Sequence, residues 1–327
     1  MPYILSISIL FVFIATGCTS KQYFQAENTS NFNKKTLNLD SAIIDLNSNG
    51  ATLEDYTYIS KKGIHNELQV GYKFLNYTED TLITANDNAE IKIKNKKVNI
   101  TLSFDKNIIS SSKYNNLLAF GSVDNSITLY DLDKRQILFK EYLKHSNINN
   151  IKIANPIFLN TVIFYPTLDG KIVVVNIKDK AIIQILNIDP KSDVNNVIFL
   201  EELEDALIAS TSKKLFSFLD GKLNTKDIDI QSIILKDNFI YVATLDGKII
   251  KYDIALNKIA SKKFKFAKIK ALAFGKDLYA LESQGYLIRI STNFKEVKIF
   301  DFAFDEKEKV IGIENKIYFE DQYIKLD

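Results

Sequence analysis

Apolar and polar residues alternate in short runs along most of this chain, and one stretch shows the pattern most clearly. In Phe239–Thr244, β-branched residues recur at every second position, which is typical of a β-strand. Asp246 and Gly247 follow, a pair that supplies the positive φ angles of a two-residue type I′ turn. The run Lys248–Ile254 is again rich in Ile and Tyr. The pattern predicts a β-hairpin closed by this turn.

The same hairpin sequence occurs twice. Thr167–Ile172 and Thr244–Ile249 share the six letters TLDGKI, so Asp169 and Gly170 correspond to the turn residues of the first hairpin. An identity of this length inside similar hairpins indicates an internal repeat. Two repeats separate the two turns, which gives a period of roughly forty residues, as in the four-stranded blades of β-propellers.

The remaining strand-like runs fit this period. Six groups of four runs follow one another, each with the order strand, polar loop, strand, tight turn, strand, short link and strand. These groups cover residues 72–104, 108–142, 151–188, 194–228, 230–264 and 269–302. The sequence therefore predicts an all-β fold, a β-propeller of four-stranded antiparallel blades.

The last group contains only three runs, within Val310–Leu326. An incomplete blade would leave an unpaired sheet edge, and the segment Leu37–Leu46 can supply the missing strand. We expect this N-terminal strand to pair with Tyr318–Leu326 and so to close the ring. The expected count is then seven blades, or eight if Thr52–Ile64 belongs to a further, irregular blade.

The first residues differ from the repeats. Residues 1–17 carry no charged side chain, and their apolar run is too short to span a bilayer but has the length of a signal-peptide core. The run Ala15-Thr16-Gly17-Cys18 resembles the lipobox of bacterial lipoproteins, in which the cysteine becomes lipidated after cleavage. This resemblance implies a lipoprotein signal peptide at 1–17 and lipidation, with palmitate, of Cys18. A plain secretory signal followed by an unrelated cysteine is the alternative.

The polar segment that follows, residues 18–35, is expected to be a flexible tether between the lipid and a propeller at 36–327. Cys18 is the only cysteine, so a lipidated chain has no internal disulfide. Thr19 stands next to it, and the sorting rule of proteobacterial lipoproteins retains proteins with Asp at that position in the inner membrane. The resemblance thus implies the outer membrane, with the domain facing the periplasm.

The repeats resemble quinoprotein-type, PQQ-like β-propellers, on the pattern LDGKIIKYDI that begins at Leu245. Together with the lipobox, the chain looks like the propeller lipoprotein subunit of the bacterial outer-membrane β-barrel assembly machinery. WD-repeat propellers are the nearest alternative, but Trp is absent from the whole chain, so their Trp-Asp signature is missing. The absence of Trp also argues against a quinone cofactor, which stacks on Trp in the quinoprotein dehydrogenases.

The amino-acid composition argues against several classes of function. The 42 Lys and Arg residues nearly balance the 40 Asp and Glu residues, which argues against binding of nucleic acid through bulk charge. The two histidines, His65 and His145, lie far apart and are expected in exposed loops, so no metal site is expected. We expect Asp169 and Asp246 to be turn residues and not general acids, and we expect neither a cofactor nor a catalytic site.

One acidic run remains as a candidate for partner binding. Glu201, Glu202, Glu204 and Asp205 lie between two predicted strands and would form a negative patch on one loop. Loops carry function on rigid scaffolds, so this loop is a candidate docking site for a basic partner, with a merely solvated loop as the alternative.

The function that these features predict is a non-catalytic, periplasm-facing scaffold lipoprotein, an accessory factor in outer-membrane β-barrel protein assembly. Its partner would be a protein, such as the membrane-inserted barrel insertase. The alternatives are a ligand-binding or enzymatic propeller in the cell envelope, or a surface lipoprotein that binds external partners.

Overall fold

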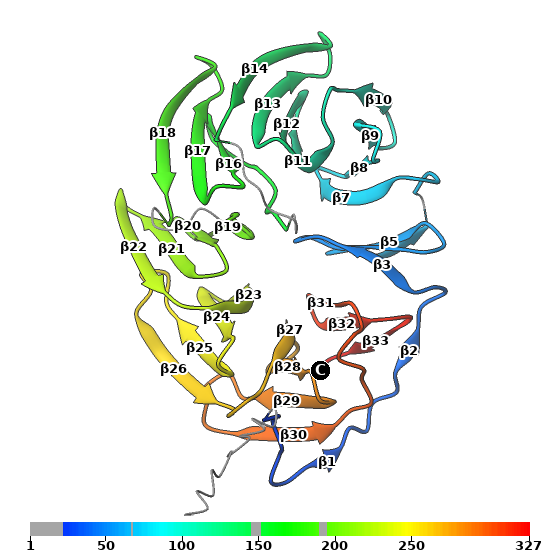
Figure 1. The fold of residues 1–327 in the computed structure, drawn as a ribbon, viewed down its shortest axis with the longest axis vertical. Helices are drawn as coiled ribbons and strands as arrows, with labels where there is room; N and C mark the ends of the chain where they lie inside the picture. The colour runs from blue at the N-terminus through cyan, green and yellow to red at the C-terminus, as the bar shows by residue number, and fades with distance from the viewer. Residues whose placement is uncertain (1–21, 67, 145–151, 190–194) are drawn as a thin grey trace, which may run out of the picture.

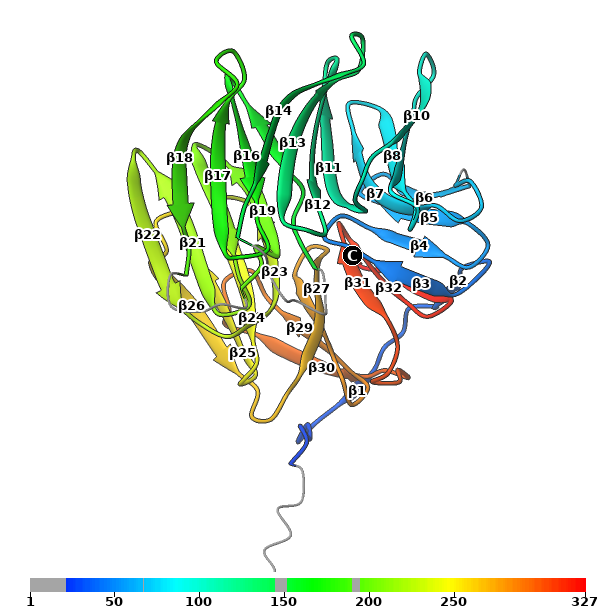
Figure 2. The same ribbon diagram turned by 45° about the horizontal axis from the view of Figure 1, so that its top comes forward.

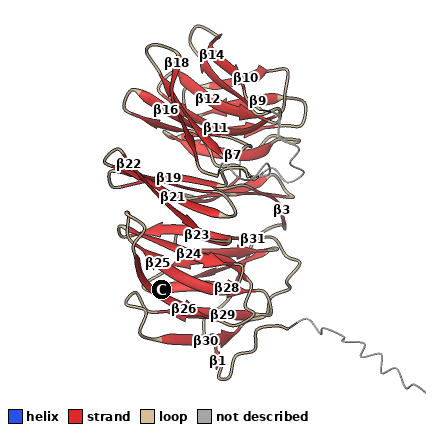
Figure 3. Cartoon of the chain, turned by 60° about the vertical axis from the view of Figure 1, so that its left-hand side comes forward, coloured by secondary structure: helices blue, strands red, loops and turns tan. Residues whose placement is uncertain are grey.

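The computed structural model describes residues 22–66, 68–144, 152–189 and 195–327. These residues form eight β-sheets arranged in a ring (Figure 1). Strands make up the regular structure of the described chain (Figure 3), and none of its segments is a helix of the length and apolarity that crossing a membrane requires. We call the sheets blades I to VIII, in chain order from Ile43.

Within each blade, strands that follow one another in the chain pair antiparallel, side by side. Blades I to IV consist of β3 (Ile43–Leu46), β4 (Ala51–Leu53), β5 (Thr57–Ser60), β6 (Gly63–Asn66); β7 (Lys73–Thr78), β8 (Thr81–Ala85), β9 (Glu90–Lys94), β10 (Asn99–Ser103); β11 (Ile108–Tyr114), β12 (Leu117–Ser122), β13 (Ser126–Asp131), β14 (Gln136–Tyr142); β15 (Ile157–Leu159), β16 (Val162–Pro166), β17 (Lys171–Asn176) and β18 (Ala181–Asn187).

Blades V to VIII continue the same arrangement. They consist of β19 (Phe199–Leu203), β20 (Ala206–Ser210), β21 (Lys214–Leu219), β22 (Lys222–Asp227); β23 (Ile230–Lys236), β24 (Phe239–Thr244), β25 (Lys248–Tyr252), β26 (Lys258–Lys263); β27 (Ile269–Phe274), β28 (Leu278–Glu282), β29 (Tyr286–Ile290), β30 (Val297–Asp301); and β31 (Val310–Ile313), β32 (Lys316–Phe319) and β33 (Gln322–Lys325).

The N-terminal segment closes the ring, as expected. Strand β2 (Leu37–Asn38) pairs antiparallel with β33, with Leu37 opposite Tyr323, and becomes the fourth strand of blade VIII. Strand β1 (Ser30–Asn31) adds a fifth, parallel strand to the outer edge of blade VII (Figure 2). The N-terminal part of the described chain is therefore joined to blades VII and VIII through backbone pairing.

The described residues form eight blades, the alternative to the expected seven. The segment Leu37–Leu46 is divided between two blades: β2 completes blade VIII, and β3 begins blade I. Between them the chain turns on two backbone hydrogen bonds, from Leu39 N to Asp321 O and from Ile43 N to Glu320 O. The segment expected to form an irregular blade, Thr52–Ile64, provides strands of blade I.

The core lies between the blades. Eight hydrophobic clusters of buried side chains each join two neighbouring blades, and together they pass once around the described ring. Most of these side chains are Ile, Leu, Val or Phe. Most also come from the two middle strands of a blade, which are apolar on both faces because each face is covered by a blade. Each blade therefore buries apolar side chains against both of its neighbours, which stabilises the closed ring.

The hydrophobic cluster between blades I and II is the smallest, and it consists mainly of stacked aromatic side chains. Tyr58 stacks on Phe74 with centroids 5.1 Å apart, and His65 stacks on the other side of Tyr58 at 4.9 Å. The expectation of an exposed loop for His65 is wrong: it lies on β6 and is half-buried, because its ring stacks on Tyr58 and lies parallel to Tyr77. His145 lies outside the described residues.

Contacts with the propeller begin before residue 36. The Phe24 side chain is 7% exposed and packs edge-on against Phe264 and Tyr286, with centroids 6.0 and 5.3 Å away. Phe32 packs on Phe300 of blade VII at 5.3 Å. The described part of the segment expected to be a tether, residues 22–35, therefore lies along blades VI and VII.

The two repeated turns differ from the expected type I′ geometry. Of their residues only Gly170 and Gly247 have positive φ, at 74° and 78°, whereas type I′ needs two positive φ angles. Gly247 N bonds to Thr244 O at 2.9 Å, so the loop has three residues, a type I turn followed by a left-handed glycine. The Thr side chain selects this form, because Thr244 Oγ1 accepts the Lys248 N–H at 2.9 Å.

Candidate functional site

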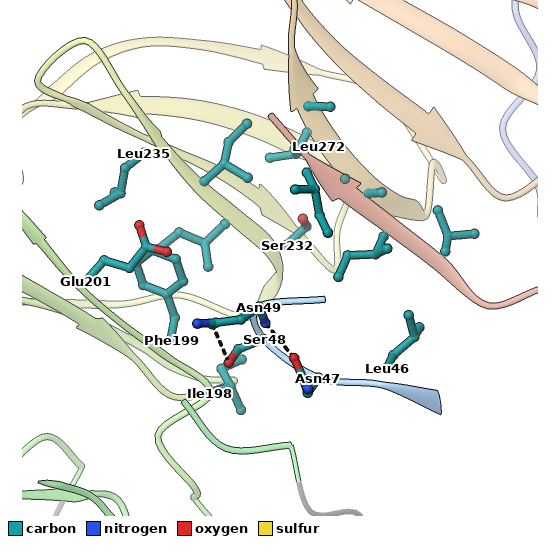
Figure 4. Close-up of a pocket in the computed structure, with 18 of the residues that line it drawn as sticks. Leu46, Asn47, Ser48, Asn49, Ile198, Phe199, Glu201, Ser232, Leu235 and Leu272 are labelled. Atoms are coloured by element: carbon teal, nitrogen blue, oxygen red, sulfur yellow. Dashed lines mark hydrogen bonds between the residues drawn. The ribbon is translucent and has the colours of Figure 1, made fainter. Parts of the chain in front are cut away.

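A pocket of 270 Å³ opens at the centre of the ring. Its walls come from the innermost strands β19, β23, β27 and β31 and from the loop between β3 and β4. In Figure 4, Asn49, Glu201 and Ser232 lie around the pocket on three of these elements. A site made from so many blades exists only when the ring is closed.

A repeated backbone irregularity shapes this centre. The innermost strands of blades I, II, III, VI and VII each contain a β-bulge against their second strand. A bulge turns one extra side chain out of the alternating pattern. Two of these extra residues, Gln231 and Lys270, line the pocket. Neither residue stands out in the sequence, because the bulge and not a motif directs it inward.

Amide side chains connect the pocket to blades I to IV. Asn49 Nδ2 donates to Asn76 Oδ1 at 2.9 Å, and Asn76 Nδ2 donates to Ser111 O at 2.9 Å. Ser111 N in turn donates to Asn155 Oδ1 at 2.8 Å. Asn76 and Asn155 are buried, so these bonds satisfy polar groups that would otherwise be costly inside the ring. The network fixes the inner strands of the four blades relative to one another.

The pocket carries a positive surplus. Lys61 Nζ pairs with Glu201 Oε1 at 2.9 Å, and Lys270 Nζ donates to Glu306 O at 2.8 Å. Lys152 also lines the pocket. Its side chain keeps contact with solvent, but removal from bulk water by the walls, together with the charge of Lys270, lowers the pKa of Lys152. The lining holds apolar, amide and charged groups but no His or Cys among the described residues.

The acidic run does not form one loop. Glu201 and Glu202 lie on strand β19, and the alternation of a strand sends them to opposite faces. Glu201 reaches the central pocket, whereas Glu202 is exposed. Only Glu204 and Asp205 occupy the exposed turn between β19 and β20. The predicted patch is therefore reduced to this pair, whose role in binding stays a prediction.

The two turn aspartates have different surroundings. The Asp169 side chain is 9% exposed and accepts hydrogen bonds from Thr167 Oγ1 at 2.7 Å and from Asn125 Nδ2 at 3.1 Å. Burial raises the pKa of Asp169, but hydrogen bonds from Lys171, Thr167 and Asn125 outweigh it and hold that pKa below its usual value. Asn125 belongs to blade III, so Asp169 links two blades.

Asp246 is the exposed counterpart. Its side chain is 52% exposed and pairs with Lys263 at 2.8 Å and with Lys248 at 2.9 Å. Hydrogen bonds from Lys263, Thr244 and Lys248 lower the pKa of Asp246. These contacts join the turn to β26 of the same blade, so this aspartate makes no link between blades through the bonds described.

We expect Asp169→Asn to lower the free energy of unfolding by about 1–3 kcal/mol, because the amide cannot replace every acceptor contact of the buried carboxylate. The matched change Asp246→Asn should cost under about 1 kcal/mol, since exposed ion pairs contribute little. Because its folded pKa is lowered, the Asp169 contribution exists above the usual aspartate pKa and fades as the pH falls below about 4. Urea unfolding at several pH values measures the free energy of unfolding of both variants. Equal decreases for the two variants would contradict the role of Asp169 as a buried link between blades.

The predicted lipidation site, Cys18, lies outside the described residues. Among the described residues, no group of three or more His, Cys, Asp or Glu side chains is arranged to hold a metal ion.

No family model matches the chain. The plasminogen-binding protein PgbB of Helicobacter pylori strain J99 is 27% identical to it, over 99% of this chain and 71% of that protein. PgbB of strain 26695 is also 27% identical, over 99% of this chain and 70% of its own length.

Solved structures share the fold at low sequence identity. BamB from Moraxella catarrhalis matches with a TM-score of 0.63 and 10% identity, over 88% of this chain and 99% of BamB. The C-terminal WD40 domain of Sif2 matches with a TM-score of 0.64 and 13% identity, over 91% of this chain and all of that domain. The chain is thus a β-propeller that resembles BamB in structure and PgbB distantly in sequence.

Proposed function

We propose that this chain is a non-catalytic, protein-binding β-propeller of the bacterial surface, with plasminogen as the first partner to test. The observation that supports this proposal is the similarity to plasminogen-binding PgbB, which extends over 99% of the chain and so includes every blade. An extracellular protein partner corresponds to a surface lipoprotein, one of the alternatives that the sequence left open.

The geometry is compatible with binding by a preformed surface. Eight buried interfaces hold the blades together, and the turns and links at both ends of the strands provide exposed surface. A rigid surface loses little conformational entropy on association, which favours affinity. The central pocket offers apolar, amide and charged groups for a side chain of the partner. The proposal includes a lipid anchor at Cys18 in the outer membrane.

Direct binding tests the proposal. A chain that begins at Thr19 contains every described contact, and we expect it to bind immobilised plasminogen saturably in biolayer interferometry, with serum albumin as the control ligand. Equal signals on the two ligands, or no signal on plasminogen from a chain with an intact thermal transition, would refute it.

A pair of variants then examines the predicted acidic site. Glu204→Lys with Asp205→Lys reverses the charge of the β19–β20 turn, and Asp105→Lys with Asp179→Lys reverses two exposed acids of other blades as the matched control. If the acidic turn docks the partner, only the first variant should lose affinity. The loss should be about tenfold or more, because lost charge pairs cost on the order of 1–2 kcal/mol of binding free energy. Equal affinities would place the binding surface elsewhere.

A second candidate function follows from the fold. The BamB likeness covers 99% of that structure, and it favours a periplasmic accessory role in barrel assembly. The two proposals differ in the location of the propeller, at the cell surface or in the periplasm, and in its protein partner. Protease added to intact cells should cleave a surface propeller, whereas a periplasmic propeller should survive and co-purify with the barrel insertase after crosslinking.

A further inference from the structure

Blade VI exposes an apolar cluster at one rim of the ring. Leu245 is 59% exposed, Phe266 is 40% exposed, and Tyr23 of the N-terminal segment is 45% exposed. Large side chains of this kind are exposed at a cost unless a partner or a membrane covers them. We call Tyr23, Leu245 and Phe266 the rim cluster.

Two contacts place the segments that carry these three residues next to one another. The turn that carries Leu245 packs against the link that carries Phe266, since a Cβ on Gly247 would lie 2.2 Å from Phe264 O and 2.9 Å from Ala267 O. Phe264 in turn holds Phe24, the neighbour of Tyr23, with ring centroids 6.0 Å apart. Figure 2 shows the described chain starting beside the link between β26 and β27.

The exposure of Leu245 is a property of this blade and not of its sequence. The identical hexapeptide in blade IV places Leu168 at the same turn position, where it is only 2% exposed. There, Leu168 N donates to Asn125 Oδ1 of the neighbouring blade at 2.8 Å. In blade VI the corresponding N–H bonds to Asp229 O, and the side chain points to solvent.

Lysines surround the rim cluster. Lys263 and Lys248 both pair with Asp246, which leaves this group with a positive charge. Lys265 and Lys268 are exposed and make no ion pair within the described chain, and Lys265 Nζ lies 4.8 Å from the Phe266 ring centroid. The acids that contact these segments are Asp246, Asp229 and the buried Glu282, whose Oε1 accepts the Lys268 N–H at 3.1 Å. The four lysines, Lys248, Lys263, Lys265 and Lys268, exceed these three acids.

The start of the described chain indicates what covers the rim. Tyr23 follows Cys18 by five residues, which span at most about 18 Å when extended. The apolar run of residues 4–14, or a lipid on Cys18, would therefore bring a membrane within reach of this rim. Aromatic and leucine side chains next to lysines are the composition that membrane interfaces favour.

We propose that the rim cluster is a membrane-contact surface, in which Tyr23, Leu245 and Phe266 enter the headgroup region of an anionic bilayer. Lys263, Lys265 and Lys268 contact the phosphates. Three side chains and a few charges bind weakly, so the rim acts beside a second anchor and fixes the orientation of the propeller. The opposite rim is then directed away from the membrane. This inference is independent of the identity of the protein partner.

The chain has no Trp, which permits a specific test. Phe266→Trp in a chain that begins at Thr19 introduces a single tryptophan at the rim, and Tyr142→Trp introduces one on β14, where Tyr142 is 64% exposed. Selective excitation of tryptophan separates its emission from that of the tyrosines. With vesicles of equal phosphatidylglycerol and phosphatidylethanolamine, the emission of the Phe266→Trp variant should move to shorter wavelength and be quenched by brominated lipid. The emission of the Tyr142→Trp variant should not change.

Charge variants complete the test. Lys265→Gln and Lys268→Gln, each combined with Phe266→Trp, should weaken partition onto the anionic vesicles by roughly fivefold per lysine, and phosphatidylcholine vesicles should bind least. Thermal melts confirm that each variant is folded. An unchanged spectrum of the Phe266→Trp variant at saturating lipid, or equal shifts for the rim and β14 fluorophores, would overturn the proposal. A third result would also overturn it: the Phe266→Trp variant does not bind vesicles, and Phe266→Ser abolishes plasminogen binding. That result would assign the rim to a protein partner.

Discussion

A chain that begins at residue 41 is expected to lose cooperative thermal unfolding or to aggregate. The truncation removes β2, which leaves β33 with an unpaired outer edge, and β1, which covers the edge of blade VII. It also removes Phe24 and Leu39, both 7% exposed. Each buried Phe or Leu contributes about 2–5 kcal/mol, a sum comparable with the whole stability of an ordinary domain.

Two longer chains act as controls for this truncation. A chain that begins at Thr19 keeps every described contact and should melt in one transition. A chain that begins at residue 29 loses Phe24 but keeps both strands, and its unfolding free energy should fall by about 3 kcal/mol without loss of cooperativity. Melts followed by far-UV circular dichroism separate the three cases. If the chain from residue 41 melts like the chain from Thr19, then the N-terminal strands do not close the ring.

Gly247→Ala is expected to destabilise the fold by more than about 3 kcal/mol, through two separate effects. Its φ of 78° is strained for any residue with a Cβ, which costs on the order of 1 kcal/mol. The Cβ would also lie 2.2 Å from Phe264 O, a backbone atom that cannot move without shifting the link to blade VII. Overlap of this kind adds roughly 1–3 kcal/mol or more.

Gly221→Ala is the matched control for this prediction. Gly221 has a φ of 71°, close to that of Gly247, but no atom lies within 4 Å of its Cβ position. The free energy of unfolding of Gly221→Ala should therefore fall only by the backbone strain, about 1–2 kcal/mol. Chemical denaturation of both variants measures the difference. Equal losses would mean that the link Phe264–Ala267 does not pack against the turn as described.

Local pattern was sufficient for the strands and for the class of fold. The alternation in Phe239–Thr244 and the repeated TLDGKI predicted hairpins and a blade period, because side-chain alternation and turn chemistry act over a few residues. The incomplete C-terminal group predicted closure by the segment Leu37–Leu46, of which β2 pairs with β33, since an unpaired edge needs a partner. Asp220 and Gly221 show that type I′ turns do occur here, with both φ angles positive, at a different Asp-Gly pair.

The predicted acidic loop and the central pocket needed more than pattern. The run from Glu201 to Asp205 reads as one polar loop, but pairing of β19 with β20 extends the strand through Leu203 and divides the acids. The pocket residues Lys61, Lys152 and Lys270 come from three blades and share no motif. Their proximity depends on contacts between residues that are far apart in the chain, which no local rule reports.

By itself, the sequence determined the strands, the blade period and the need for a closing strand, because each follows from side-chain alternation, turn residues and backbone pairing within a short segment. Tertiary structure alone decided the count of eight blades, the assignment of Ile43–Leu46 to blade I, and the opposite exposures of Leu168 and Leu245 in identical hexapeptides. The physical reason is that burial depends on which neighbouring blade covers a turn. Asn125 of blade III binds the turn of Leu168, whereas the turn of Leu245 lies open beside the start of the described chain.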